Sequence, residues 1–232
     1  MTTPDGSPAD APRVPGSPSQ ARAPARADGA AAALAALAGD LGDRIRFLVE
    51  LDRLKLVLRR TLLSDESRRE NTAEHSWHVA LLALVLADQA DEPVDALHVA
   101  RLMLVHDIVE IDAGDTFVYD TAGRETQAAR EEAAADRLFG LLPDPQGPEL
   151  RRDWDEFEAG TTPEARFARA IDRLQPLLLN HASRGAAWRD HGITADRVRR
   201  VNSTIGESST ALWDVAQRVI DDAVARGWLA EP

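Results

Sequence analysis

The sequence contains no cysteine, which excludes disulfide bonds, thiolate catalysis and cysteine-ligated zinc sites. It also lacks any apolar run of the roughly 18–20 residues that a membrane-spanning helix needs. The small-residue stretch at 30–38 is short and follows a proline-rich segment instead of a compact basic one, so we expect no signal peptide there. These absences predict a cytoplasmic protein without a membrane partner.

Basic residues are scarce as well. The 27 Lys and Arg are outnumbered by 39 Asp and Glu, which gives a formal net charge of −12, and no basic stripe runs along the chain. Proteins that bind a nucleic acid polymer need clustered Lys and Arg, so we do not expect this class. A small phosphate-bearing substrate is compatible with the charge, provided that local cations or a metal ion offset the acidic field.

The remaining composition, 44% apolar and 28% charged, is typical of a globular protein. Residues 1–28 hold many Pro, Ser and Ala and almost no large apolar side chains, so we predict a disordered tail there. Beyond the tail, apolar residues recur every three or four positions from Leu41 to Leu58, the spacing of a helix, and no alternating run indicates a strand. The sequence therefore predicts an all-α bundle, one domain at about 38–230.

Several helix starts are marked in the sequence. Asn71, followed three residues later by Glu74, is typical of a capping box. Pro93 suits the first turn of the next helix, which we expect to run to about Val109. Further caps are expected at Thr162, Thr194 and Thr210.

The strongest chemical signal is His106–Asp107 at the end of the apolar run "VARLMLVHD". His75 lies one turn into a helix with an apolar continuation, and Asp172 lies within the apolar segment "FARAIDRLQPLLL". A buried carboxylate is unfavourable unless it is paired or binds a metal. Two imidazoles and two carboxylates form a mixed set that suits a borderline or hard divalent ion.

Simpler interpretations of these residues stay open at the level of sequence. A single histidine is more often a core or surface residue than a ligand. Asp172 could form an ion pair with Arg169 or Arg173 instead of binding a metal. Trp77 is expected in the core, and so are Trp154 and Phe157, which are spaced three residues apart on one predicted helix.

Three segments in order, "RRENTAEHSWHVALLA", "LVHDIVEIDAGD" and "FARAIDRLQPLLLN", resemble the HD-domain metal-dependent phosphohydrolases, and in particular the 5′-deoxynucleotidase-like subfamily. The resemblance covers roughly residues 40–225 and implies an HD-domain helical bundle. It further implies that one divalent ion (Mn, Co, Mg, Fe or Zn) is held by four ligands: His75, His106, Asp107 and Asp172.

The same resemblance implies three further roles. Glu110 orients the attacking water, Asp115 assists near the leaving oxygen, and Arg60 holds the substrate phosphate. Glu110 is four residues after His106 and would share its face if the helix persists. Taken without the resemblance, Glu110 reads as a solvated helix-end charge, Asp115 as a turn residue and Arg60 as a helix C-terminal cation.

The implied activity is release of phosphate from nucleoside 5′-monophosphates by a homodimeric phosphoric monoester hydrolase. One alternative is hydrolysis of nucleoside triphosphates or another small phosphate ester, and a second is a non-catalytic, metal-stabilised helical dimer. Thr61 follows Arg60 where the bacterial deoxynucleotidases have an aromatic residue, which predicts weaker discrimination between deoxyribose and ribose.

Overall fold

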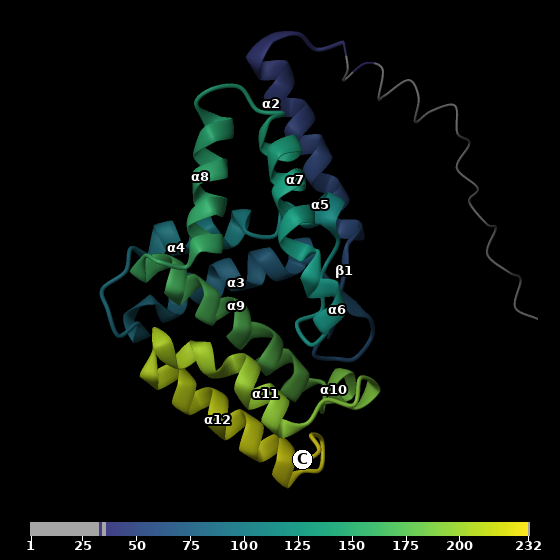
Figure 1. Ribbon diagram of the computed structural model, residues 1–232, viewed down its shortest axis with the longest axis vertical. Helices are drawn as coiled ribbons and strands as arrows, with labels where there is room; N and C mark the ends of the chain where they lie inside the picture. The colour runs from purple at the N-terminus through teal and green to yellow at the C-terminus, as the bar shows by residue number, and fades with distance from the viewer. Residues whose placement is uncertain (1–32, 34–35, 232) are drawn as a thin grey trace, which may run out of the picture.

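The fold is a helical bundle arranged around one long helix (Figure 1). The computed structural model describes residue 33 and residues 36–231, so the tail predicted at 1–28 lies outside the described residues. Among the described residues, none of the helices is both long and apolar enough to cross a membrane. The elements are α2 (Gly39–Glu50), η1 (Leu51–Leu56), β1 (Leu58–Leu62), β2 (Arg69–Asn71), α3 (Thr72–Leu86), η2 (Ala87–Gln89), α4 (Ala96–Val105), α5 (Glu110–Ala113), α6 (Thr121–Glu125), α7 (Gln127–Phe139), α8 (Gln146–Ala159), α9 (Pro163–Ala182), α10 (Ala186–Asp190), α11 (Ala195–Asn202), η3 (Ser203–Glu207) and α12 (Thr210–Ala225).

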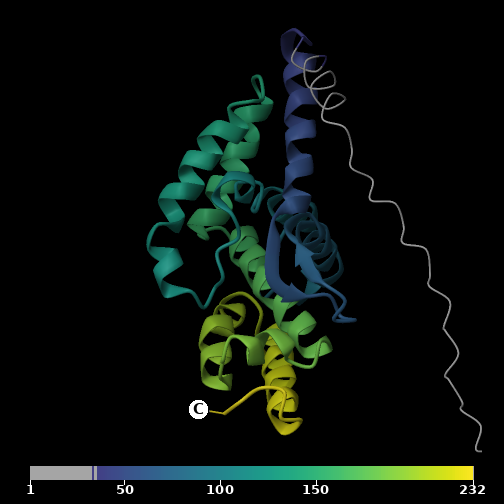
Figure 2. The same ribbon diagram turned by 90° about the vertical axis from the view of Figure 1, so that its right-hand side faces the viewer.

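Helix α9 crosses the middle of the molecule, with α7 and α8 on one side of it and α11 and α12 on the other (Figures 1 and 2). Two apolar clusters hold these layers together. The first joins α3, α4, α9, α11 and α12, with residues such as Val79, Leu102 and Ile171 inaccessible to solvent. The second joins α2, η1, α5, α7 and α8 around Leu138. The segment that follows α4 leads from the first cluster into the second.

Two of the helices that carry the candidate site, α3 and α9, begin where the sequence predicts, whereas α4 begins at Ala96 behind the cap of Asp95, so Pro93 lies outside its first turn. The Asn71 side chain accepts the N–H of Glu74 at 3.0 Å, and a Glu74 carboxylate oxygen accepts the N–H of Asn71 at 3.2 Å, which confirms the capping box of α3. Thr162 caps α9 by accepting the N–H of Ala165 at 3.1 Å, with Pro163 in the first turn. These caps fix the first turns of the two helices that supply His75 and the Asp172 carboxylate.

The structure corrects the predicted boundaries in several places. The first helix ends at Glu50 instead of Leu58. Residues Leu51–Leu56 form the 3-10 helix η1, and Leu58 begins the strand β1, which pairs antiparallel with β2. Helix α4 ends at Val105 and a turn separates it from α5, so the helix does not persist to Val109. Ser209, not Thr210, caps α12. Pairing between the two strands of this hairpin overrides the helical apolar spacing that reaches Leu58.

Candidate active site

The four predicted metal ligands meet at the junction of three elements. His75 comes from the first turn of α3, His106 and Asp107 from the turn after α4, and Asp172 from α9. The Nε2 atom of His75 lies 3.0 Å from an oxygen of Asp172, and Nε2 of His106 lies 3.1 Å from an oxygen of Asp107 and 3.6 Å from the same oxygen of Asp172. One ligand atom each from His75, His106 and Asp172 falls within 4.8 Å of the others, close enough for a single ion.

Hydrogen bonds on the far side of each imidazole orient it as a ligand. His106 Nδ1 donates to the carbonyl of Met103 at 2.8 Å, which leaves Nε2 with its lone pair facing the cluster. This Nε2 atom is buried and has no hydrogen-bond partner among the described residues. His75 Nδ1 lies 3.0 Å from the side-chain oxygen of Gln175, which likewise directs Nε2 of His75 towards Asp172. Two unprotonated nitrogens beside two carboxylates fit a divalent metal ion.

The electrostatics of the cluster also favour a cation. Burial lowers the pKa of His106, but the carboxylates of Asp107 and Asp172 outweigh burial and raise this pKa well above its usual value. The negative surroundings therefore attract positive charge to Nε2 of His106. A divalent ion can supply that charge in place of a proton.

Gln175 and Glu70 support the ligand shell, and the sequence interpretation missed both. The amide of Gln175 donates to Glu70 at 2.7 Å and contacts His78 Nδ1 at 3.1 Å, while its oxygen holds His75. Burial raises the pKa of Glu70 to about 7. Gln175 is three residues after Asp172 on α9, so helical spacing could have pointed to it, whereas Glu70 reaches the site only through the β1–β2 hairpin.

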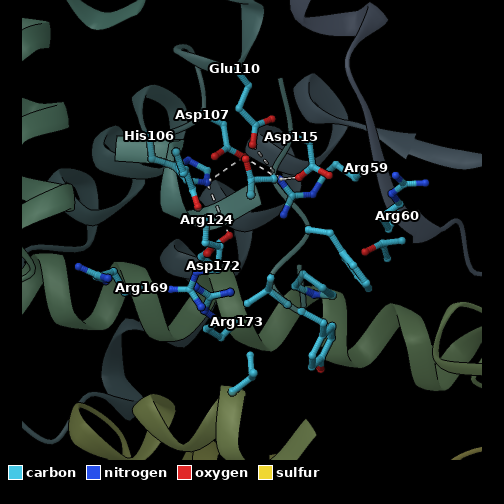
Figure 3. Close-up of a pocket in the computed structure, with 18 of the residues that line it drawn as sticks. Arg59, Arg60, His106, Asp107, Glu110, Asp115, Arg124, Arg169, Asp172 and Arg173 are labelled. Carbon is cyan, nitrogen blue, oxygen red and sulfur yellow. Dashed lines mark hydrogen bonds and ion pairs between the residues drawn. The ribbon is translucent and has the colours of Figure 1, made fainter. Parts of the chain in front are cut away.

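Arg59 is the cation that lies among the acidic residues (Figure 3). Its Nη1 atom is 2.8 Å from Asp107, 3.8 Å from Asp115 and 3.9 Å from Glu110, and its side chain is 13% exposed. Burial would lower the pKa of Arg59, but these carboxylates raise it, so the guanidinium stays charged. The family resemblance pointed to Arg60, which also lines the cavity but makes none of these contacts. Counting along the chain cannot tell which residue of a strand faces a site.

Glu110 and Asp115 lie on the same side of the His–Asp cluster as Arg59. Burial, followed by the charge of Asp107, raises the pKa of Glu110 well above its usual value, and the Thr72 hydroxyl donates to Glu110 at 2.7 Å. Burial also raises the pKa of Asp115. The chain turns into this position through Gly114, whose φ of +73° suits a residue without a side chain. Both carboxylates are therefore held close to the cluster without being bonded to its imidazoles.

A cavity of about 350 Å³ opens beside these residues. Thr61 and Phe157 line it, and the Phe157 ring contacts the His106 ring edge-on at a centroid distance of 4.9 Å. Phe157 is therefore both a core residue and part of the cavity wall, while Trp154 packs in the second apolar cluster as predicted. The prediction for Trp77 is wrong, because this side chain is 61% exposed on the outer face of α3.

Comparison with known proteins agrees with this geometry. The 5′-deoxynucleotidase HDDC2 of Bos taurus is 33% identical over 135 residues and that of Homo sapiens 30% identical over 135 residues; the match spans 58% of this chain and 64% and 65% of those two proteins. The crystal structure of a predicted metal-dependent phosphohydrolase from Magnetospirillum magnetotacticum MS-1 superposes with a TM-score of 0.79 at 51% identity, covering 82% of this chain and 96% of that one. A family model described as an HD domain matches residues 51–213, and the chain therefore belongs to the HD domain family.

Proposed function

We propose that this protein is a metal-dependent phosphohydrolase that releases phosphate from nucleoside 5′-monophosphates. The observation that carries the proposal is the unpartnered Nε2 of His106, which faces the carboxylates of Asp107 and Asp172 beside a charged arginine, Arg59. In this proposal one divalent ion is held by His75, His106, Asp107 and Asp172. The relatives named 5′-deoxynucleotidase support a nucleotide monophosphate over a triphosphate as substrate.

The chain's own residues account for the proton transfers. A bound divalent ion would supply a Lewis acid that polarises a phosphate oxygen and acidifies water. Glu110 accepts the proton of the attacking water, a role that suits a carboxylate whose pKa is raised well above its usual value by burial. Asp115 gives a proton to the departing 5′-oxygen, which its own raised pKa favours. Arg59 offsets negative charge on the phosphoryl oxygens, and Arg60, further along β1, is a second cation for the same group.

The activity can be tested by measuring phosphate release from dAMP, AMP and dATP with Mn²⁺, Co²⁺ or Mg²⁺. We expect both monophosphates to be hydrolysed and dATP to be a poor substrate. Hydrolysis of dATP alone would favour the triphosphate alternative. If no ester is hydrolysed with any metal, the site is structural, as in the non-catalytic alternative.

The metal assignment needs a separate measurement. Elemental analysis of the purified protein should give about one divalent ion per chain, and Asp107→Ala should lose most of it. Arg101→Ala is a matched control. Arg101 lies on α4 and pairs with Asp153 of α8 at 2.6 Å instead of with a residue of the cluster. Equal metal content in the wild type and in Asp107→Ala would contradict the assignment.

We also propose that the protein is a homodimer joined through the outer faces of α3 and α4. Trp77, Leu81, Leu84 and Val85 follow one stripe of α3 at 42–72% exposure, and Leu97 on the neighbouring α4 is 75% exposed. Monomeric proteins rarely expose a contiguous apolar patch of this kind. A two-fold axis would pair the patch with its own copy, so the same residues cover each other.

A further inference from the structure

The cavity extends from the metal cluster along one face of α9. The lining residues of this helix are spaced by three, one, three, one and three positions, which is the pattern of a single helical face: Arg169, Asp172, Arg173, Pro176, Leu177 and Asn180. Asp172 and Asn180 are eight residues apart, or about 12 Å along the helix axis. If the phosphate of a nucleotide lies at Asp172 and the rest of the molecule follows α9, its sugar therefore occupies this distance and its base reaches Asn180.

Asn180 presents a polar group that the protein itself leaves unused. The residue is 9% exposed, and its buried Oδ1 atom has no hydrogen-bond partner among the described residues. Its backbone is fixed, since the Asn180 carbonyl accepts the N–H of Gly185 at 2.7 Å. A buried carboxamide without a partner is unfavourable in the free protein, and a ligand that bonds to it would remove this penalty.

The surroundings of Asn180 suit a flat, largely apolar group with polar atoms on its edge. Leu177, Pro176 and Trp188 line the cavity next to it. Asn202 also lines the cavity, but its amide already donates to the Val198 carbonyl at 2.8 Å. A free carboxamide carries a donor and an acceptor side by side, and an asparagine pairs in this way with adjacent polar atoms of adenine.

We propose that Asn180 is the base-recognition residue of this cavity and that its carboxamide binds the polar edge of adenine in a nucleotide substrate. This inference rests on the proposed function, because it assumes that the phosphate occupies the metal end of the cavity. It adds a base preference that the ligand cluster alone cannot give, since the cluster contacts only the phosphate end.

The test compares kcat/KM for dAMP, dGMP, dCMP, dTMP and 2-deoxyribose 5-phosphate in the wild type and in Asn180→Leu. The wild type should prefer dAMP, and Asn180→Leu should reduce kcat/KM for dAMP by about 10- to 100-fold. The baseless 2-deoxyribose 5-phosphate should be hydrolysed equally by both proteins. A drop of equal size for dAMP and for the baseless ester, or no drop for dAMP, would overturn the role of Asn180 while the phosphohydrolase activity stands.

A second variant and a binding measurement cover the remaining outcomes. Asn180→Asp keeps the side-chain shape but offers only acceptors, so it should also lose the dAMP preference, even if Asn180→Leu fails to fold. Calorimetric titration with 2′-deoxyadenosine, which has no phosphate, should detect binding to the wild type and much weaker binding to either folded variant. If no ester is hydrolysed, this titration still decides the role of Asn180, because equal binding by wild type and variants would exclude it.

Discussion

Glu110 is a buried carboxylate whose pKa is raised well above its usual value, chiefly by that burial. It lies beside Asp107 and Arg59. Among the described residues it forms no ion pair with His75 or His106, so we do not expect it to be a third acidic ligand. We predict that Glu110→Gln keeps its bound metal and loses about 10²- to 10⁴-fold in kcat, the usual contribution of a general base. Metal content and turnover should be measured on the same preparation.

A matched control is Glu131→Gln, since Glu131 also lines the cavity in a buried position but is held by Gln127 at 2.8 Å. This variant should retain most of its activity. Loss of the metal from Glu110→Gln would make Glu110 a ligand and remove it from the role of base.

Arg59 and Arg60 form a second matched pair at the residue scale. Arg59 lies within 4 Å of four carboxylates, whereas Arg60 lines the cavity without such contacts. Arg59→Ala should therefore lower kcat/KM for every phosphate ester more strongly than Arg60→Ala, whatever the base. Arg59→Lys should recover only part of the loss, because a lysine cannot reproduce the planar fork of the guanidinium. A larger effect at Arg60 would favour Arg60 as the phosphate-binding residue, as the family resemblance implies.

Glu70 links the site to the pH dependence of stability. Its pKa is about 7 in the folded protein, against an ordinary value of 4.5 for a glutamate in an unfolded chain, because burial disfavours the charged form. Glu70 therefore ionises at a lower pH in the unfolded chain than in the folded protein. As the pH rises from 4.5 to 7, this difference lowers the free energy of unfolding by roughly 3 kcal/mol. The loss is complete above pH 7 and absent below pH 4.5. Glu70→Gln should therefore gain stability relative to the wild type between about pH 5 and pH 8. Denaturant unfolding at both pH values measures this, and a constant difference between the two proteins would contradict it.

At the scale of elements, the Thr162 hydroxyl caps the first turn of α9, the helix that carries the proposed metal ligand Asp172. Thr162 makes a side-chain cap bond to the Ala165 N–H, while Thr194 precedes α11 without one. Thr162→Ala should lower the free energy of unfolding by about 1 kcal/mol. Thr194→Ala is the control and should change it by much less. Equal losses in urea unfolding would mean that the capping bond is not the cause.

At the scale of the whole molecule, the metal site connects segments from α3 to α9, so a bound ion should stabilise the entire domain. A ligand present at 100 times its dissociation constant adds about 2.7 kcal/mol to the free energy of unfolding. Chelation should therefore lower the Tm of the wild type by several degrees. The Tm of Asp107→Ala should not respond to the chelator. A Tm that falls equally in both proteins would point to an effect outside the cluster.

The proposed dimer makes a prediction about mass in solution. Trp77→Asp introduces a charge into the apolar stripe of α3 and should convert the dimer into a monomer, as read by light scattering during gel filtration. Val215→Asp is the control, since Val215 is 42% exposed on α12, away from the stripe. A monomeric wild type would exclude the dimer. Dissociation by both variants would mean that the interface lies elsewhere.

The sequence by itself determined the helical architecture, the caps of α3 and α9 and the four residues His75, His106, Asp107 and Asp172 that meet at the candidate site. These features depend on local chemistry: a cap bonds within one turn, and a carboxylate such as Asp172 within an apolar helix face needs a partner wherever the helix packs. The roles of Glu110 and Asp115 remain predictions, although both lie where those roles require.

Only the tertiary structure decided that Arg59 lies among the carboxylates of the site and which residues hold the imidazoles from behind. Arg59 and Glu70 reach the cluster because β1 pairs with β2, a contact between segments that no alternating apolar run marks as strands. Trp77 is exposed because the outer face of α3 meets no other element among the described residues, and Asn180 is unpartnered there because the cavity continues past the metal end. Contacts between elements, or the lack of such contacts, set each of these outcomes, and periodicity along one segment carries no information about the partner that another segment will supply.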